Sequence, residues 1–83
     1  MDEVSALFER VPVGWSVVTY DGRRYGVTRS VSAGGRSGSV YAEALDGSDV
    51  VSANVYRIDD RDLLKPCEMP EAKVLDFLRD LET

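Results

Sequence analysis

The sequence predicts an α+β fold in which an antiparallel four- to five-stranded meander is flanked by a short N-terminal helix and a longer C-terminal helix. Apolar residues recur at helical spacing at both ends of the chain, whereas β-branched and aromatic residues fill the middle. An Asp-Gly turn separates two of these middle runs and marks a hairpin. At 83 residues the chain has room for one hydrophobic core, so we expect a single α+β domain over residues 1–83.

The first helix is predicted over about residues 3–10. Asp2 is placed to cap it, and Pro12 ends it because the residue before a proline is driven out of helical angles. Its apolar residues fall on one face: Val4, Leu7, Phe8 and Val11.

The hairpin prediction depends on Asp21-Gly22, which joins residues 15–20 to residues 23–28. A two-residue type I′ turn needs positive φ at both positions, and Asp-Gly is a preferred pair for it. The turn fixes the expected pairings: Tyr20 with Arg23, Val18 with Tyr25, and Val17 with Gly26.

Two further strands are expected over Ser39–Leu45 and Val50–Ile58, with a loop over Ser30–Gly38 because of its serines and glycines. Alternation puts small side chains on one sheet face, as where a helix lies close: Val40, Ala42, Ala44, Val51, Ala53 and Val55. Leu63–Lys65 is a candidate edge strand, ended by Pro66.

The second helix is predicted over about residues 70–82, with Pro70 at its first position. One apolar stripe runs along it: Val74, Leu75, Leu78 and Leu81. We expect both helices to cover the same face of the sheet.

Composition excludes several kinds of site. The chain has no histidine, which rules out His-based triads and His-containing zinc sites, and its one cysteine cannot form an internal disulfide. The net charge of −5 opposes nucleic-acid binding, although Arg23, Arg24 and Arg29 form a local basic group. We expect no cofactor and no metal. With no apolar run long enough to span a bilayer and no signal peptide, we expect no membrane association and a cytoplasmic protein.

Three motifs have ordinary alternatives that fit better. Gly34-Gly35 lacks the Gly-Lys-Ser/Thr and following helix of a phosphate loop, so a hairpin loop is expected. The aspartates at 59, 60 and 62 lack the spacing of an EF-hand and fit a solvated turn. Glu43 is not marked as half of a catalytic carboxylate pair, and alternation makes it an exposed strand residue.

Cys67 is the candidate catalytic residue. It precedes the second helix by three residues and follows Lys65, two features that favour a thiolate, whereas Glu68 opposes one. Without a histidine to act as base, a half-buried structural cysteine that fills a corner with Met69 is the favoured alternative.

Several segments together resemble a family of short bacterial proteins, some of them labelled peptide methionine sulfoxide reductases. These segments are Phe8–Ser16, Gly22–Val27, Tyr41–Glu43 and Leu64–Pro70. The resemblance implies thiol-dependent redox chemistry, for which Cys67, in a Pro-Cys-Glu-Met context, is the sole thiol.

The predicted binding residues are aromatic and basic: Tyr20, Arg23, Arg24, Tyr25 and Tyr41. Tyrosine and arginine dominate interface hot spots, and a sheet covered by helices on one face leaves the other free for a partner. We therefore predict a non-catalytic protein-interaction module that binds an unknown protein or a second copy of itself. The alternative is a redox enzyme or sensor, similar to methionine sulfoxide reductase, that uses Cys67.

Overall fold

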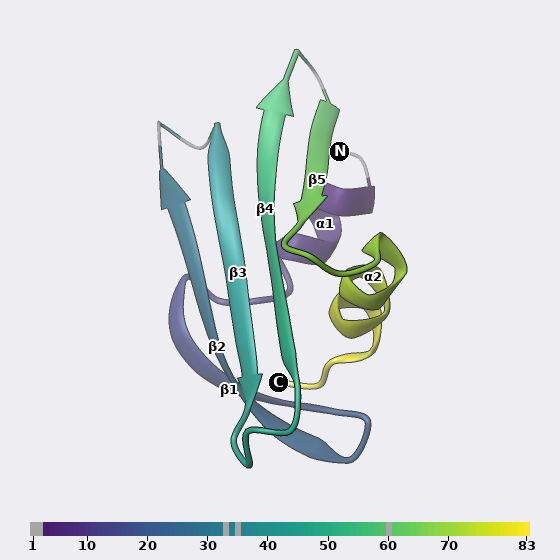
Figure 1. Cartoon of the computed structure of the whole chain (residues 1–83). Coiled ribbons are helices and arrows are strands. Elements are labelled where there is room, and N and C mark those ends of the chain that lie inside the picture. Colours follow the sequence, from purple (N-terminus) through teal and green to yellow (C-terminus); the bar gives the residue numbers. More distant parts are fainter. Residues whose placement is uncertain (1–2, 33, 35, 60) are drawn as a thin grey trace.

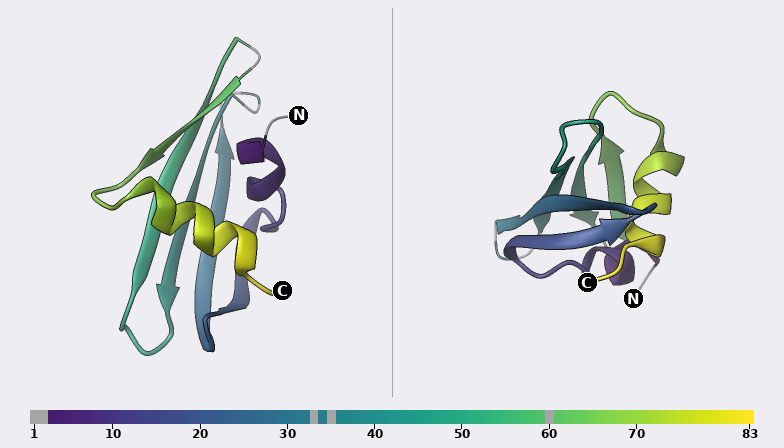
Figure 2. Two further views of the ribbon diagram at one scale, coloured as in Figure 1. Left: turned by 90° about the vertical axis from the view of Figure 1, so that its right-hand side faces the viewer. Right: turned by 90° about the horizontal axis from the view of Figure 1, so that it is seen from below.

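The computed structural model describes residues 3–32, 34, 36–59 and 61–83. Five antiparallel strands lie side by side in chain order, and both helices pack on one face of the sheet (Figures 1 and 2). The elements are α1 (Glu3–Phe8), β1 (Gly14–Tyr20), β2 (Arg23–Ser32), β3 (Ser37–Ala44), β4 (Val50–Ile58), β5 (Arg61–Pro66) and α2 (Glu71–Asp80). The predicted α+β class, meander and flanking helices are confirmed.

The first hairpin has the predicted turn and register. Asp21 and Gly22 have φ values of 52° and 74°, the left-handed pair that a type I′ turn requires. Tyr20 lies opposite Arg23, and Val17 lies opposite Gly26, as expected.

The second hairpin is longer than predicted. Residues 30–32 and 37–38 pair as strand, ending at Ser32 opposite Ser37, so the expected Ser30–Gly38 loop was wrong over most of its length. Ladder hydrogen bonds to the neighbouring strand outweigh the low strand propensity of serine and glycine. Gly35 in the expected glycine loop lies outside the described residues.

The helices are shorter than predicted, and the edge strand is longer. α1 ends at Phe8, after which Arg10 N donates to Leu7 O and Val11 N to Phe8 O, the i to i−3 bonds of a tightened last turn. Pro70 is the N-cap residue before α2 and not its first helical residue, and the backbone at Leu81, after the helix, is extended. β5 runs from Arg61 to Pro66, because the backbone pairs with β4 beyond the expected apolar residues. The predicted cap Asp2 lies outside the described residues.

The core lies between the helices and one sheet face, which we call the covered face. Tyr20, Tyr25 and Phe77 meet edge to face there, with ring centroids 5.1–5.9 Å apart. The predicted small residues lie beside them, buried or half-buried: Val40, Ala42, Ala44, Val51, Ala53 and Val55. They let α2 approach the sheet closely.

The chain ends by pairing with its first strand. Glu82 N donates to Thr19 O and Thr19 N to Glu82 O, both at 2.8 Å. Within the described residues, no helix has the length and hydropathy needed to cross a membrane.

Candidate functional site

The sheet face that neither helix covers, here the open face, carries most of the exposed apolar surface. It comprises alternate residues of the ranges 15–19, 24–32, 37–45, 50–58 and 61–65. Of the eight large apolar or aromatic side chains exposed in the described part of the chain, six belong to it: Trp15, Tyr41, Leu45, Tyr56, Ile58 and Leu63. Exposed apolar side chains gathered on one face make it the candidate interaction surface.

Strand register arranges these residues in rows across the sheet. One row places Trp15 beside Thr28, Tyr41 and Ser52 on successive strands. Two rows away, a second row runs from Ser32 on β2 through Ser37 on β3 to Tyr56 on β4. The row between holds hydroxyl, amide and ammonium groups: Ser30, Ser39, Asn54 and Lys65. The open face thus has two aromatic patches, one formed by Trp15 and Tyr41 and the other centred on Tyr56, with a polar band between them.

A depression of about 510 Å³, the Trp15 depression, lies at the first aromatic patch. Its lining is Trp15, Gly26, Thr28, Tyr41, Glu43, Ala44, Leu45, Asp46 and Gly47. The absent side chain of Gly26 provides the room, since a Cβ there would lie 3.3 Å from Trp15 Nε1 and 3.5 Å from Leu45 Cδ2. The indole therefore lies over the strand while remaining 68% exposed.

A smaller hollow of about 160 Å³ lies at the polar band. Four serines, Asn54 and Tyr56 line it together with Gly38, so its polar groups are hydroxyls and an amide. Such a lining can exchange hydrogen bonds with a partner without adding charge.

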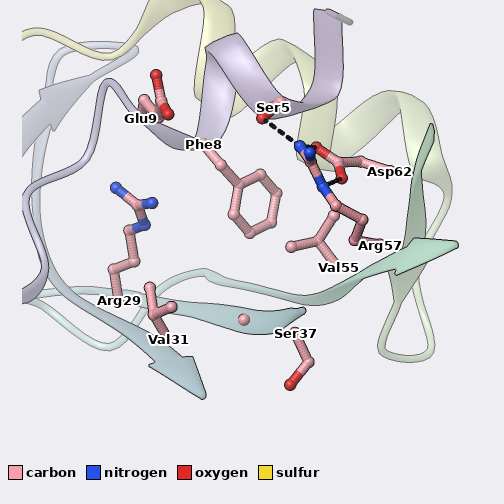
Figure 3. A pocket seen from close by; sticks show the side chains of 10 residues that line it. Ser5, Phe8, Glu9, Arg29, Val31, Ser37, Val55, Arg57 and Asp62 are labelled. Carbon is pink, nitrogen blue, oxygen red and sulfur yellow. Dashed lines mark hydrogen bonds and ion pairs between the residues drawn. The ribbon is translucent and has the colours of Figure 1, made fainter. Parts of the chain in front are cut away.

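On the covered face, a cavity of about 220 Å³ lies beside α1 (Figure 3). Phe8, Val31 and Val55 form its apolar part, and Arg29 and Arg57 flank it. Both guanidinium groups are already engaged: Arg29 donates to Val11 O at 2.8 Å, and Arg57 Nε pairs with Asp62 at 3.0 Å. Arg57 Nη2 also donates to Ser5 Oγ of α1 at 3.5 Å, so both arginines serve contacts within the fold, which makes this cavity a weaker candidate for a ligand site.

The predicted binding residues do not share one surface. Tyr25 is fully buried and Tyr20 packs against it, so both serve the core rather than a contact surface. Arg23 is half-buried at the hairpin end, where it donates to Ser48 Oγ at 2.8 Å. Only Arg24 and Tyr41 lie on the open face.

A polar network accounts for the buried tyrosine. The Tyr25 hydroxyl donates to Asp49 Oδ2 at 2.8 Å, and Lys73 Nζ donates to Asp49 Oδ1 at 2.7 Å. Burial, together with the bond to Asp49, raises the pKa of Tyr25 to about 12. The Lys73 hydrogen bond lowers the pKa of Asp49 and outweighs the opposing effect of burial.

Cys67 is exposed, contrary to the expected half-buried position. Its backbone N–H donates to Ser52 O at 3.0 Å, and Asn54 Nδ2 lies 4.0 Å from its sulfur, at the β5 edge of the open face. Because the backbone still pairs with β4 after Pro66, the Cys67 thiol lies outside the corner between the sheet and α2, where Met69 packs against the core. No group of three or more potential metal ligands gathers within the described residues.

Trp15 and Tyr56 were not among the binding residues predicted from the sequence. The signal for Trp15 was present, since the hairpin register already separates it from the face that holds Tyr25. Comparison with protein-family models, curated proteins and solved structures found no match.

Proposed function

We propose that this chain is a non-catalytic interaction domain that binds a protein partner through its open face. The observation that carries the proposal is the gathering of Trp15, Tyr41 and Tyr56, with three large aliphatic side chains, on a face without cover. Tyrosine and tryptophan bury large area at low entropic cost and dominate interface energetics.

The shape of the face favours a macromolecule over a small ligand. Small-molecule sites are concave and enclose most of their ligand. Here the hollows are open, and the aromatic patches lie on different rows of a broad sheet. A partner that spans the face would contact both patches and the polar band between them.

A second copy of the chain is one candidate partner. The net charge of −5 on each copy opposes self-association, but the open face itself carries Arg24, Arg61 and Lys65 with Glu43. A homodimer through this face would therefore strengthen with added salt, because screening reduces the overall repulsion more than any local attraction.

The test compares the native protein with the triple variant Trp15→Ser, Tyr41→Ser and Tyr56→Ser. We expect the triple variant to fold, since these side chains are exposed, and to lose either self-association in light scattering or the partners retained in pull-down. Val13→Ser is the matched control, because Val13 is 65% exposed but lies outside the open face. The proposal would be refuted if the native protein is a monomer and the native protein, the triple variant and Val13→Ser all retain the same partners.

A redox role for Cys67 is the second candidate, favoured by the exposure of its thiol. This role predicts that methionine sulfoxide reduction with an added thiol reductant is lost in Cys67→Ser and kept in the open-face triple variant. Turnover that persists in Cys67→Ser, or its absence in the native protein, would exclude it.

A further inference from the structure

The lining of the Trp15 depression combines exposed aromatic rings with negative charge. Trp15 is 68% exposed and Tyr41 is 47% exposed. Glu43 and Asp46 are also exposed, and no lysine or arginine is among the residues that line the depression. Within the described residues, no salt bridge is formed by either carboxylate.

We infer that the Trp15 depression binds an arginine side chain presented by the protein partner. This inference rests on the proposed function and names the chemistry that one part of the open face recognises. A cation over an indole is held by the ring's negative face, and a neighbouring carboxylate adds charge-assisted hydrogen bonds.

Arginine fits this lining better than lysine. The planar guanidinium stacks on an aromatic ring and presents paired N–H donors that match a carboxylate, whereas an ammonium is a compact and strongly hydrated charge. Trp15 supplies the ring surface at one side of the depression, and Glu43 lies directly opposite Gly26 in the strand register. The indole itself covers Gly26, so a guanidinium stacked on its exposed side lies in the same depression as the Glu43 carboxylate and can contact both groups.

Charge complementarity favours a cation from another molecule. The chain's net charge of −5 attracts basic segments, and the two carboxylates repel phosphate and other anions. Arg24 lies on the same face, two residues from Gly26, yet it does not line the depression. The site is left open to an incoming side chain.

The test uses two capped tripeptides, acetyl-Gly-Arg-Gly-amide and the same peptide with citrulline, a neutral arginine isostere. Trp15 is the only tryptophan, so its fluorescence and its indole N–H signal in NMR report on the depression directly. We expect saturable changes with the arginine peptide and an affinity for the citrulline peptide that is lower by roughly tenfold.

Two variants locate the effect. Glu43→Gln should reduce binding of the arginine peptide to the level of citrulline, whereas Glu71→Gln, an exposed acid on α2, should leave it unchanged. Both substitutions are at exposed positions, so circular dichroism should match the native protein. Equal binding of the two peptides, or full binding by Glu43→Gln, would overturn the inference.

Failure of the inference can be told from failure of the proposed function. If partner binding is lost in the open-face triple variant but kept in Glu43→Gln, the open face is the interface and the arginine contact is not part of it. If the triple variant keeps its partners, the proposed function itself fails.

Discussion

At the residue scale, Asp49 is the polar group that links the buried Tyr25 of the sheet to α2. It accepts from the buried Tyr25 hydroxyl and from Lys73 of α2, so one carboxylate holds the β3–β4 turn against the helix. A tyrosine can be buried here only because its hydroxyl reaches this acceptor.

Asp49→Asn should destabilise the protein most at neutral pH. The pKa of Asp49 is lowered on folding, so its contribution is present above the unfolded value of about 3.9 and is lost as pH falls through the folded value. We expect a loss of about 1–2 kcal/mol at pH 7 that shrinks toward pH 3.

Urea denaturation followed by circular dichroism across this pH range measures the effect of Asp49. Asp76→Asn, an exposed position on α2, is the control for a change in net charge. A constant difference between the native protein and Asp49→Asn at every pH would contradict the role of the carboxylate charge.

Two glycine substitutions should have opposite consequences. In Gly38→Ala the new Cβ would lie 3.0 Å from the backbone oxygen of Ser30, which cannot move without disturbing β2, so we expect a loss of about 1–3 kcal/mol. In Gly26→Ala the close neighbours are the exposed Trp15 and Leu45 side chains, which can shift.

For Gly26→Ala we expect a change in stability within about 1 kcal/mol and a shift in Trp15 fluorescence emission. Thermal unfolding and emission spectra of both glycine variants test the contrast. A larger destabilisation by Gly26→Ala than by Gly38→Ala would show that the indole is held more rigidly than its exposure indicates.

At the element scale, Arg10 links the segment that follows α1 to the end of α2. Its guanidinium donates to the carbonyl oxygens of Leu78 and Leu81 at 2.8 and 2.9 Å, and also to that of Arg79. The last carbonyls of a helix have no partner within it, so this arginine satisfies groups that water would otherwise have to reach. Glu3 adds an ion pair with Arg79 between the same helices.

Arg10→Met should therefore destabilise the protein by about 1–3 kcal/mol, because it retains the aliphatic stem and removes the donors. In the same variant, hydrogen exchange of the backbone amides in the last turn of α2 should be faster than in the native protein. Arg36→Met serves as the control, since Arg36 is also exposed but its contact is through its backbone oxygen to Arg57 N. Equal unfolding free energies for the two variants would contradict the capping role.

The elements that the sequence predicted well are those with a local signal. Asp21-Gly22 specified both its turn and the register of the strands around it. The apolar stripe predicted for α2 matched its buried face at Val74 and Leu78, but Phe77, outside the stripe, is buried more fully than Leu75. The extent of β2 and β3 near Ser32 and Ser37 was not predictable, because those residues are strand only through pairing with each other. The Arg10 contacts join residues 68–71 positions apart, which no local pattern reveals.

The candidate site was predicted in part for the same reason. The small side chains of β3 and β4 indicated the face that the helices cover, but the register that places Tyr25 opposite Ala44 on that face was not predicted. Tyr25 and Tyr41 are equally plausible surface residues by composition, and packing under Phe77 decides between them.

At the scale of the whole molecule, the C-terminal residues close the fold against its first strand. Leu81 is buried, and Glu82 pairs with Thr19 at the outer edge of β1. Exposed strand edges invite pairing with other chains, and this contact occupies part of one edge.

Deleting Glu82 and Thr83 should leave the protein folded but remove the acceptor of the Thr19 amide, which Glu82 O provides at 2.8 Å. We expect hydrogen exchange at Thr19 to become fast while amides of the central strand β3 stay protected. Two-dimensional NMR during exchange in D₂O measures both. Unchanged protection at Thr19 would mean that the contact is not maintained in solution.

The one-sided packing of the sheet separates side chains that build the core from side chains that remain on the open face, in alternation along the strands. Where the helices cover the strands, buried side chains alternate with more exposed ones, whereas the ends of β2 and β4 near Ser32 and Ile58 are exposed on both faces. A saturation mutational scan scored for folding should therefore show a two-residue alternation over the parts of the strands that the helices cover. Substitution on the open face leaves that alternation intact, so the proposed binding surface can diverge while the fold is kept, whereas a single-residue insertion within a strand exchanges the two sets of side chains.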